Sequence, residues 1–444
     1  MKKIPLFVAL AFSPQLFAAT DLLQVYKEAQ TQDATFQAAK SAQIAGQEKL
    51  PQARALFMPS VNLSANTTHN ETDTQTSSSS TLLSSGERKY NSHGYSVSLN
   101  QPLYRAQNYA SYAQAKSTVE QVNAQYATAE QDLVVRVAQA YFDVLLAQYN
   151  VTLAQAQQES IGEQLAQAKR NFEVGTSTIT DTHDAQARFD LTLSQEIAAQ
   201  NDLEIKRRSL QQIINRQPDE LVTVKGEVPL VSPEPNNMDA WVEKALAQNP
   251  ETQIAKAAFD IASEEVRKAH GGHLPTLDLV ATYGDTIQGG GSGFDQNAKT
   301  IGLQMNLPIF AGGATSSKVR EAVANQEKAR QELDAVQRKV ALQARQAYLG
   351  VTSGIAQVKA LQQAVISNQS SLDSTKLGLE VGVRTSVDLL NARQQLFSAR
   401  RDLAQALYGY IVSRLKLEAA AGDLNEADVS QVNGWLNQAA KPVN

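Results

Sequence analysis

Cysteine is absent from this chain of 444 residues. Its absence excludes disulfide bonds, thiolate metal sites and a lipidated cysteine at the start of a mature chain. Aromatic residues are scarce too, at 6% of the sequence. A chain with few aromatics and abundant alanine and glutamine favours long, closely packed helices over a thick globular core.

Long apolar runs are also missing, apart from one at the start of the chain. Residues 1–19 are typical of a signal peptide, with Lys2 and Lys3 before an apolar stretch that ends in Ala18 and Ala19. That stretch is too short to span a bilayer. The formal net charge of −5 argues against nucleic acid as a partner. We therefore expect an exported chain without a membrane-spanning helix.

The sequence after residue 19 contains two copies of one unit. Val25–Thr67 aligns without gaps with Trp241–Tyr283, at a constant offset of 216 residues. A gap-free match of this length indicates an internal duplication. The expected organisation is a signal peptide at 1–19, a first repeat at 20–215, a linker at 216–240, a second repeat at 241–421 and a C-terminal tail at 422–444.

Each copy has the same predicted order, namely a helix, two strands around a polar loop, a very long helix, a turn and a shorter helix. The predicted helices are Asp21–Leu56, Asn108–Phe172, Ile179–Asn215, Met238–His270, Ser316–Leu379 and Ser386–Ala421. Apolar residues in the long helices recur at spacings of three and four, which is typical of coiled coils. A helix of this kind would be roughly 95 Å long. We therefore expect neighbouring chains to bury its apolar stripe.

Four stretches alternate apolar and polar residues as strands do, at about 60–68, 93–101, 276–284 and 299–307. Each has close to the length that a tilted strand needs to cross a bilayer. The polar stretches 69–91 and 285–298 are predicted as the loops between them. Four strands cannot close a transmembrane barrel, and an open sheet edge cannot face lipid. Several chains would have to share one barrel, and three chains would supply twelve strands.

Both long helices end in a similar turn. Gly175 and Gly382 stand where a helix stops in a left-handed residue. A threonine followed three residues later by an aspartate then predicts a capping box for the next helix, with Asp181 in the first copy and Asp388 in the second. Helix capping is one interpretation of both acids, and a role in function is compatible with it.

Nothing in the sequence predicts an enzyme. There is no thiol nucleophile, and no Gly-x-Ser-x-Gly motif occurs between a strand and a helix. His270 and His273 lie close together, but a flexible loop is favoured there over a metal site. We expect no catalytic residue, no cofactor and no bound metal.

From Asp21 to Asn425 the sequence resembles the TolC family of Gram-negative outer-membrane efflux ducts. The most specific matches are the turns, Phe172–Asp181 and Val381–Asp388. The resemblance implies a mainly α protein with a small β part, whose homotrimer forms a twelve-stranded outer-membrane β-barrel continuous with a periplasmic α-helical barrel. It implies a passive exit duct of a tripartite efflux pump or a type I secretion system. A periplasmic adaptor and an inner-membrane transporter would be its partners, besides outer-membrane lipid.

The resemblance also implies roles at the turns. Asp388 would repeat threefold as an acidic ring in the lumen, which favours cations. Arg384 would hold the periplasmic mouth closed through Thr180, Asp181 and Gln164.

This chain departs from the family at two of these places. Asn391 stands where the family has a second acid, and Leu379 where it has an aromatic tether. A weaker ring and a looser closure are therefore expected, and the orientation of Asp184 is left open. The alternative function is a periplasmic coiled-coil scaffold or adhesin, which would wash off membranes without detergent.

Overall fold

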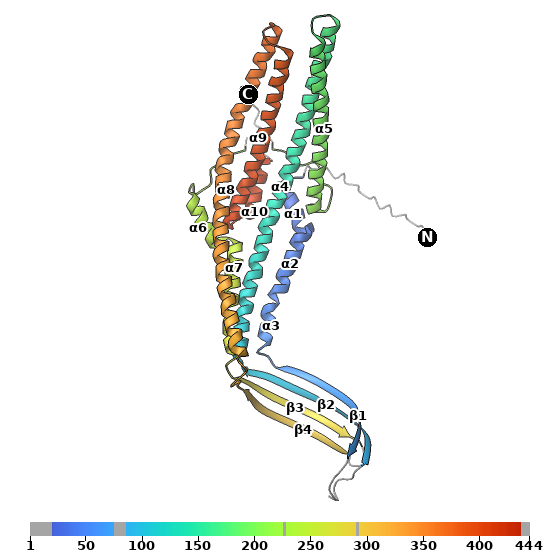
Figure 1. Cartoon of the computed structure of the whole chain (residues 1–444), viewed down its shortest axis with the longest axis vertical. Helices are drawn as coiled ribbons and strands as arrows, with labels where there is room; N and C mark the ends of the chain where they lie inside the picture. Colours follow the sequence, from blue (N-terminus) through green and yellow to red (C-terminus); the bar gives the residue numbers. More distant parts are fainter. Residues whose placement is uncertain (1–19, 75–85, 225–227, 290–292, 437–444) are drawn as a thin grey trace, which may run out of the picture. The chain divides into compact units, whose positions relative to one another are not determined.

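The computed structural model describes residues 20–74, 86–224, 228–289 and 293–436 (Figure 1). The predicted signal peptide at 1–19 and the last eight residues of the predicted tail lie outside this description. The chain divides into two compact units. Among the described residues, one unit contains the sheet and comprises those within 41–126 and 251–337. The other is helical and comprises those within 20–40, 127–250 and 338–436.

The sheet unit is built on four antiparallel strands in the order β1-β2-β3-β4. They are β1 (Ser60–Thr74), β2 (Gly86–Tyr104), β3 (Thr276–Gln288) and β4 (Phe294–Asn306). Each repeat contributes one hairpin, and pairing of β2 with β3 joins the two hairpins. The prediction of two repeats with one hairpin each is thereby confirmed.

The register gives the sheet one apolar and one polar face. Val61 lies opposite Leu99, and Leu99 opposite Ala281, which in turn faces Ile301. Directly opposed residues share a face, so this row is apolar on every strand. The adjacent row is polar and consists of Asn62, Ser98, Thr282 and Thr300. The apolar face is open, with Ile301 at 77% exposure.

The strands extend further than the sequence predicted. Each strand was predicted to have about nine residues, but β1 has 15 and β2 has 19. Much of the stretch 69–91, predicted as a loop, continues the ladder, and His69 pairs with Asn91 through both backbone and side chain. The apolar–polar alternation stops before the backbone pairing does, because these residues are polar on both faces. The pattern therefore could not mark the ends of the strands.

An ion pair between a half-buried arginine and a buried aspartate joins the start of the first long helix to the sheet. Arg105 follows β2, and its Nε and Nη2 donate to the two carboxylate oxygens of Asp278 on β3, at 2.9 and 2.8 Å. This two-point contact fixes the direction in which the chain leaves β2. The helix α4 (Ala106–Glu173) begins at the next residue, and α8 (Ala314–Glu380) is its counterpart in the second repeat.

The helical unit contains the later parts of α4 and α8 and most of the shorter helices. These are α1 (Leu22–Gln32), α5 (Ile179–Ile214), α6 (Met238–Gln248), α9 (Ser386–Ala421) and α10 (Glu426–Leu436). α5 runs back along α4, and α9 runs back along α8 (Figure 1). The α8–α9 seam is apolar, with Leu372 of α8 against Leu389 and Leu396 of α9.

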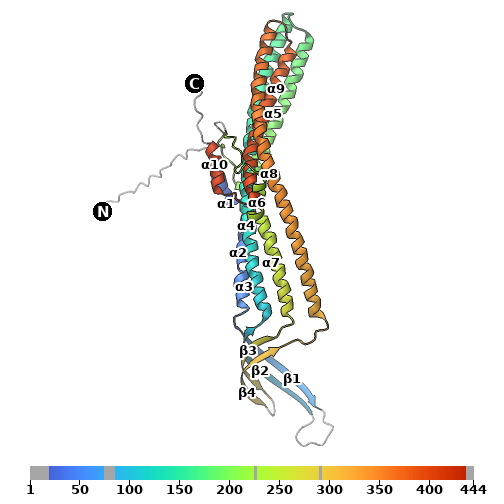
Figure 2. The same cartoon turned by 90° about the vertical axis from the view of Figure 1, so that its left-hand side faces the viewer.

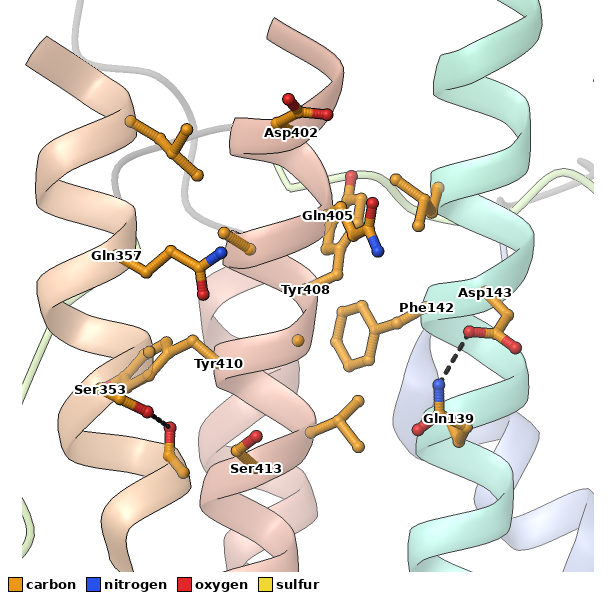
Figure 3. Close-up of a pocket in the computed structure, with 17 residues that line it drawn as sticks. Gln139, Phe142, Asp143, Ser353, Gln357, Asp402, Gln405, Tyr408, Tyr410 and Ser413 are labelled. Atoms are coloured by element: carbon orange, nitrogen blue, oxygen red, sulfur yellow. Dashed lines mark hydrogen bonds between the residues drawn. The ribbon is translucent and has the colours of Figure 1, made fainter. Parts of the chain in front are cut away.

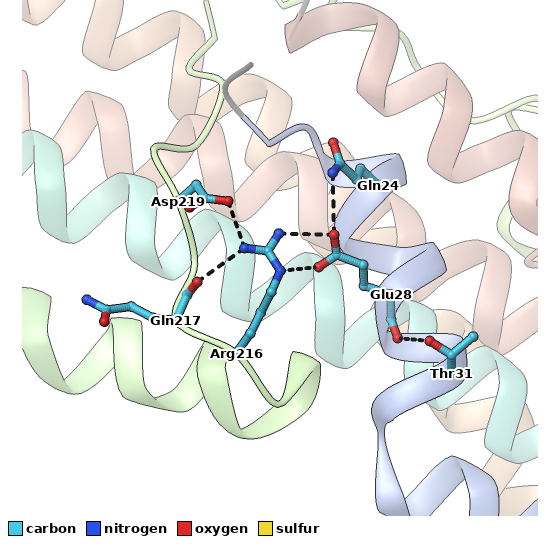
Figure 4. Close-up of polar contacts among 6 residues, drawn as sticks. All are labelled: Gln24, Glu28, Thr31, Arg216, Gln217 and Asp219. Carbon is cyan, nitrogen blue, oxygen red and sulfur yellow. Dashed lines mark hydrogen bonds and ion pairs between the residues drawn. The ribbon is translucent and has the colours of Figure 1, made fainter. Parts of the chain in front are cut away.

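Polar contacts attach the short terminal helices to this unit. Arg216, after α5, donates through Nε and Nη2 to the carboxylate of Glu28 in α1 and through Nη1 to Asp219 (Figure 4). Asn433 of α10 donates to Asp21, just before α1. α10 lies beside α1 (Figure 2). Both ends of the described chain are therefore held at the same part of the unit.

The first helix of each repeat was predicted as continuous, and this prediction was wrong. Asp33 ends α1 in an extended conformation, and α2 (Ala34–Gln47) and α3 (Lys49–Ala55) follow. In the second repeat, α6 ends before Asn249 and α7 (Pro250–Gly271) begins with proline. Proline is tolerated at the first position of a helix but not inside one. The apolar spacing continues across both breaks, which is why it did not show them.

Within the described residues, each helix is either too short or too polar to cross a membrane.

Candidate functional site

The two turns of the helical unit have the predicted backbone. Gly175 and Gly382 have φ values of +76° and +78°, in the left-handed region. After α8, the backbone N–H groups of Val383 and Arg384 both donate to the carbonyl of Gly378, at 2.8 and 3.0 Å. These bonds satisfy a carbonyl that the end of a helix leaves free, and they define the path of the backbone between α8 and the next helix.

Asp181 forms the predicted capping box at the start of α5. Its backbone N–H donates to Oγ1 of Thr178 at 3.2 Å, and its Oδ2 accepts from the Thr178 backbone N–H at 3.0 Å. Oδ2 also accepts from the hydroxyls of Thr178 and Ser177, at 2.8 and 3.1 Å. The backbone and side chain of Thr178, with Ser177, lower the pKa of Asp181 below its ordinary value.

Asp388 forms the equivalent box at the start of α9. Its Oδ2 accepts from the backbone N–H and the hydroxyl of Thr385, both at 2.9 Å. The backbone N–H of Thr385 is the main cause of a lowered pKa for Asp388, followed by the Thr385 hydroxyl and the charge of Arg384. Both acids are therefore ionised at neutral pH as well as bonded, so helix capping leaves them free to act as fixed negative charges.

Arg384 is exposed, and its aliphatic stem lies against Gly378 of α8. A side chain at position 378 would approach the Cγ of Arg384 to 2.6 Å. In the first turn Asn171 occupies the place of Gly378, and Ser177 that of Arg384. Gly378 thus provides room for the arginine only in the copy that has one, a pairing that the sequence comparison did not reveal.

The other residues predicted for the mouth do not meet Arg384 in the single chain. Gln164 is 8% exposed, and its Nε2 donates to the carbonyl of Ser386 at 3.3 Å, linking α4 to α9. Thr180 is exposed. Among the described residues, no hydrogen bond joins Arg384 to Thr180, Asp181 or Gln164. The side-chain Oε1 of Gln164 is buried without a partner there.

Two further arginines connect the repeats near the turns, and the sequence did not identify them. Arg188 of α5 donates to Asn391 and Gln394 of α9, at 2.8 and 3.2 Å. Arg393 of α9 donates to the backbone carbonyl of Ser160 in α4 at 2.8 Å, and also to its hydroxyl. The available signal was that each arginine occurs in only one copy of the repeat.

A cavity of about 560 Å³ lies within the helical unit between α4, α8 and α9 (Figure 3). Phe142 of α4 stacks on Tyr408 of α9 with ring centroids 5.6 Å apart. Burial raises the pKa of Tyr408 to about 12. The part of the chain that the structure describes holds no group of three metal-binding side chains.

Comparisons with known proteins agree with this architecture. The family model for the outer membrane efflux protein matches residues 25–216 and 241–423. The chain is 35% identical to outer membrane protein TolC of Vibrio cholerae over 99% of this chain and 100% of that protein. It is 34% identical to the alkaline protease secretion protein AprF of Pseudomonas aeruginosa, over 93% of this chain and 87% of that protein.

A solved structure gives the same fold at lower identity. The outer membrane protein VceC of Vibrio cholerae superposes with a TM-score of 0.76 at 19% identity, covering 90% of this chain and 96% of VceC. The family consists of transport proteins and is not an enzyme family. Proteins of this family are located in the outer membrane. This location argues against the alternative function, a periplasmic coiled-coil scaffold. The matched segments cover both repeats, and the chain therefore belongs to the outer membrane efflux protein family.

Proposed function

We propose that this protein is the outer-membrane exit duct of a tripartite efflux pump or a type I secretion system. It would conduct cargo passively from an inner-membrane transporter to the exterior, with a periplasmic adaptor as the third component. Membership of the efflux family supports export across the outer membrane. The similarity to AprF, a protease secretion protein, makes secreted proteins a possible cargo beside small molecules.

The exposed apolar face of the sheet is the observation that carries this proposal. Leu63 on β1 and Leu303 on β4 are 73% and 67% exposed. Within the described residues, each of these two edge strands pairs on one side only. Apolar side chains favour lipid, but unpaired backbone groups do not. Three copies that pair edge to edge would close a twelve-stranded barrel with the apolar face outward and the polar face lining a pore.

We further propose that the two turns form the periplasmic mouth of the duct. Arg384 makes none of the expected bonds within its own chain, so we assign its contacts with Thr180 and Asp181 to a neighbouring subunit. The planar guanidinium suits an aspartate and a threonine hydroxyl as acceptors. Gln164 would support this latch from within its own chain, where its Nε2 donates to the carbonyl of Ser386 at the start of α9.

Asp388 would supply the charge of the mouth. Its pKa is lowered, so it is ionised at neutral pH. Three copies around the axis would form an anionic ring that focuses the local field on cations. Asn391, three residues further along α9, is neutral, so a single ring of carboxylates is expected.

Deletion of the gene followed by complementation tests the proposed function. The deletion strain should gain sensitivity to amphiphilic drugs or lose exported proteins from its medium, and the intact gene should restore either property. The protein should stay with membranes in sodium carbonate and require detergent for extraction. Release by carbonate, with no change in sensitivity or in the exported proteins, would contradict the proposal.

A further inference from the structure

Arg188 joins the two repeats at a place where few contacts do. Within the described residues, the side-chain hydrogen bonds between α5 and α9 all come from its guanidinium. The neighbouring links, from Gln164 and Arg393, connect α9 to α4 instead. The side-chain hydrogen bonding between α5 and α9 near the turns therefore depends on one residue.

We call the contact of Arg188 with Asn391 and Gln394 the clasp, because one side chain bonds to two residues of the facing helix. Nη2 of Arg188 donates to Oδ1 of Asn391 at 2.8 Å, and Nη1 donates to Oε1 of Gln394 at 3.2 Å. The two acceptors are three residues apart and lie on the same face of α9. Two N–H groups of one planar guanidinium therefore bond to two positions about one turn apart on the facing helix. A contact of this kind fixes both the distance between α5 and α9 and their relative position along the helix axis.

The clasp is made without a carboxylate. Its acceptors are neutral amides, and no ion pair of Arg188 occurs among the described residues, although Asp184 and Asp190 lie on the same helix. Bonds from a guanidinium to neutral acceptors are weaker than those to a carboxylate. Arg188 is also only half-buried, and both amides are exposed, so water can replace either bond. The contact is directional, yet it can open and re-form.

The clasp does not follow from the duplication. The position equivalent to Arg188 in the second copy is Gln395, and Gln395 is exposed. A contact needed only to pack a helical hairpin would be expected in both copies. Arg188 instead joins the first hairpin to the second, as a contact that controls their separation would.

We propose that Arg188 is a positioning residue of the mouth, whose bonds to Asn391 and Gln394 hold α5 and α9 of one chain together in the closed state and break when the mouth widens. This inference rests on the proposed function as a gated duct. Arg188 would restrain the mouth within each chain, whereas Arg384 is proposed to connect neighbouring chains.

Single-channel recording of the purified full-length protein in planar lipid bilayers tests the clasp. Arg188→Gln should raise the conductance several-fold over the parent, and Arg188→Lys should fall between them because an ammonium has no planar fork. Arg208→Gln is the matched control, since Arg208 lies on the same helix and its partners among the described residues, Glu204 and Gln211, belong to that helix as well. It should conduct as the parent does.

A variant on the acceptor side checks that the effect belongs to this contact. Asn391→Leu combined with Gln394→Leu should raise the conductance as Arg188→Gln does, and all three changes together should add little, because they remove one interaction. If Arg188→Gln does not fold, the double variant still tests whether the contact restrains the conductance. Additive effects would overturn the clasp.

Because the chain has no cysteine of its own, α5 and α9 can be crosslinked specifically through two introduced cysteines. With Arg188→Cys and Asn391→Cys joined by a short bismaleimide, the conductance should stay at the parental level even when Arg384→Ser is also present. Without the linker it should be high. A parental conductance for Arg188→Gln, while Arg384→Ser is raised, would overturn the clasp alone. A parent protein that forms no pores would overturn the proposed duct as well.

Discussion

The ion pair between Asp33 and Arg136 stabilises the helical unit at the break between α1 and α2. Asp33 is 4% exposed, and its two carboxylate oxygens accept from Nη1 and Nη2 of Arg136 on α4, at 3.0 and 3.2 Å. Oδ1 also accepts from the backbone N–H of Phe36 at 2.7 Å, which caps α2. One buried carboxylate therefore both starts a helix and fixes it to α4.

Arg136→Ala should destabilise the protein by about 2–4 kcal/mol, since it leaves the buried carboxylate with backbone donors alone. This value lies near the lower end of the range for breaking a buried pair. The Arg136 side chain is 32% exposed, so water can supply some of the hydrogen bonds that the variant loses. The shift in the urea midpoint measures the loss, followed by circular dichroism in detergent at fixed protein concentration. Arg208→Ala is the control, because its exposed pair with Glu204 contributes only about 0.5 kcal/mol.

The pH dependence of this effect has a definite sign. Burial raises the pKa of Asp33, but the bonds from Arg136 and Phe36 outweigh it, and the pKa is lowered overall. A lowered pKa in the folded state gives stability that is complete above the ordinary aspartate value and lost as the pH falls through the folded value. The difference between the parent and Asp33→Ala should thus be full at neutral pH and shrink below about pH 4. Equal midpoints for Arg136→Ala and Arg208→Ala at neutral pH would show that the Asp33–Arg136 pair does not stabilise the fold.

Three further predictions concern the turns and the end of α9. Arg384→Ser or Asp181→Ala should raise the single-channel conductance, because each removes one side of the proposed latch, and parental conductance in both variants would argue against it. Asp388→Asn should lower the preference for cations in reversal-potential measurements, and a parental reversal potential would exclude the ring. Gly422→Ala should lower the urea midpoint far more than Gly382→Ala. Both glycines have positive φ, but only at position 422 would a Cβ meet backbone atoms, at 2.7 Å. Similar shifts would show that the backbone conformation alone sets the cost.

The sequence predicted those features that depend on local patterns. The two glycine-stopped helices and the capping boxes of Asp181 and Asp388 follow from residues a few positions apart, and all were confirmed. The division of each strand into an apolar and a polar face was confirmed as well, because the register preserves the alternation across all four strands.

Features that depend on distant residues were not predicted. The break at Asp33 is stabilised by an arginine about 100 positions away, and apolar spacing carries no information about such a partner. The room that Gly378 provides for Arg384, and the contact of Arg188 with α9, arise only when the turns and helices are placed in space. The strand ends were missed because polar residues can continue a ladder through their backbone.

Copies of this chain are expected to form a water-filled pore whose mouth is restrained by the turns. Recording from the purified parent protein in planar bilayers tests it most directly. We expect discrete insertion steps of low conductance, and a several-fold larger conductance for Arg384→Ser at the same salt concentration. A membrane that stays silent, or a parent whose pores are as conductive as those of Arg384→Ser, would contradict it.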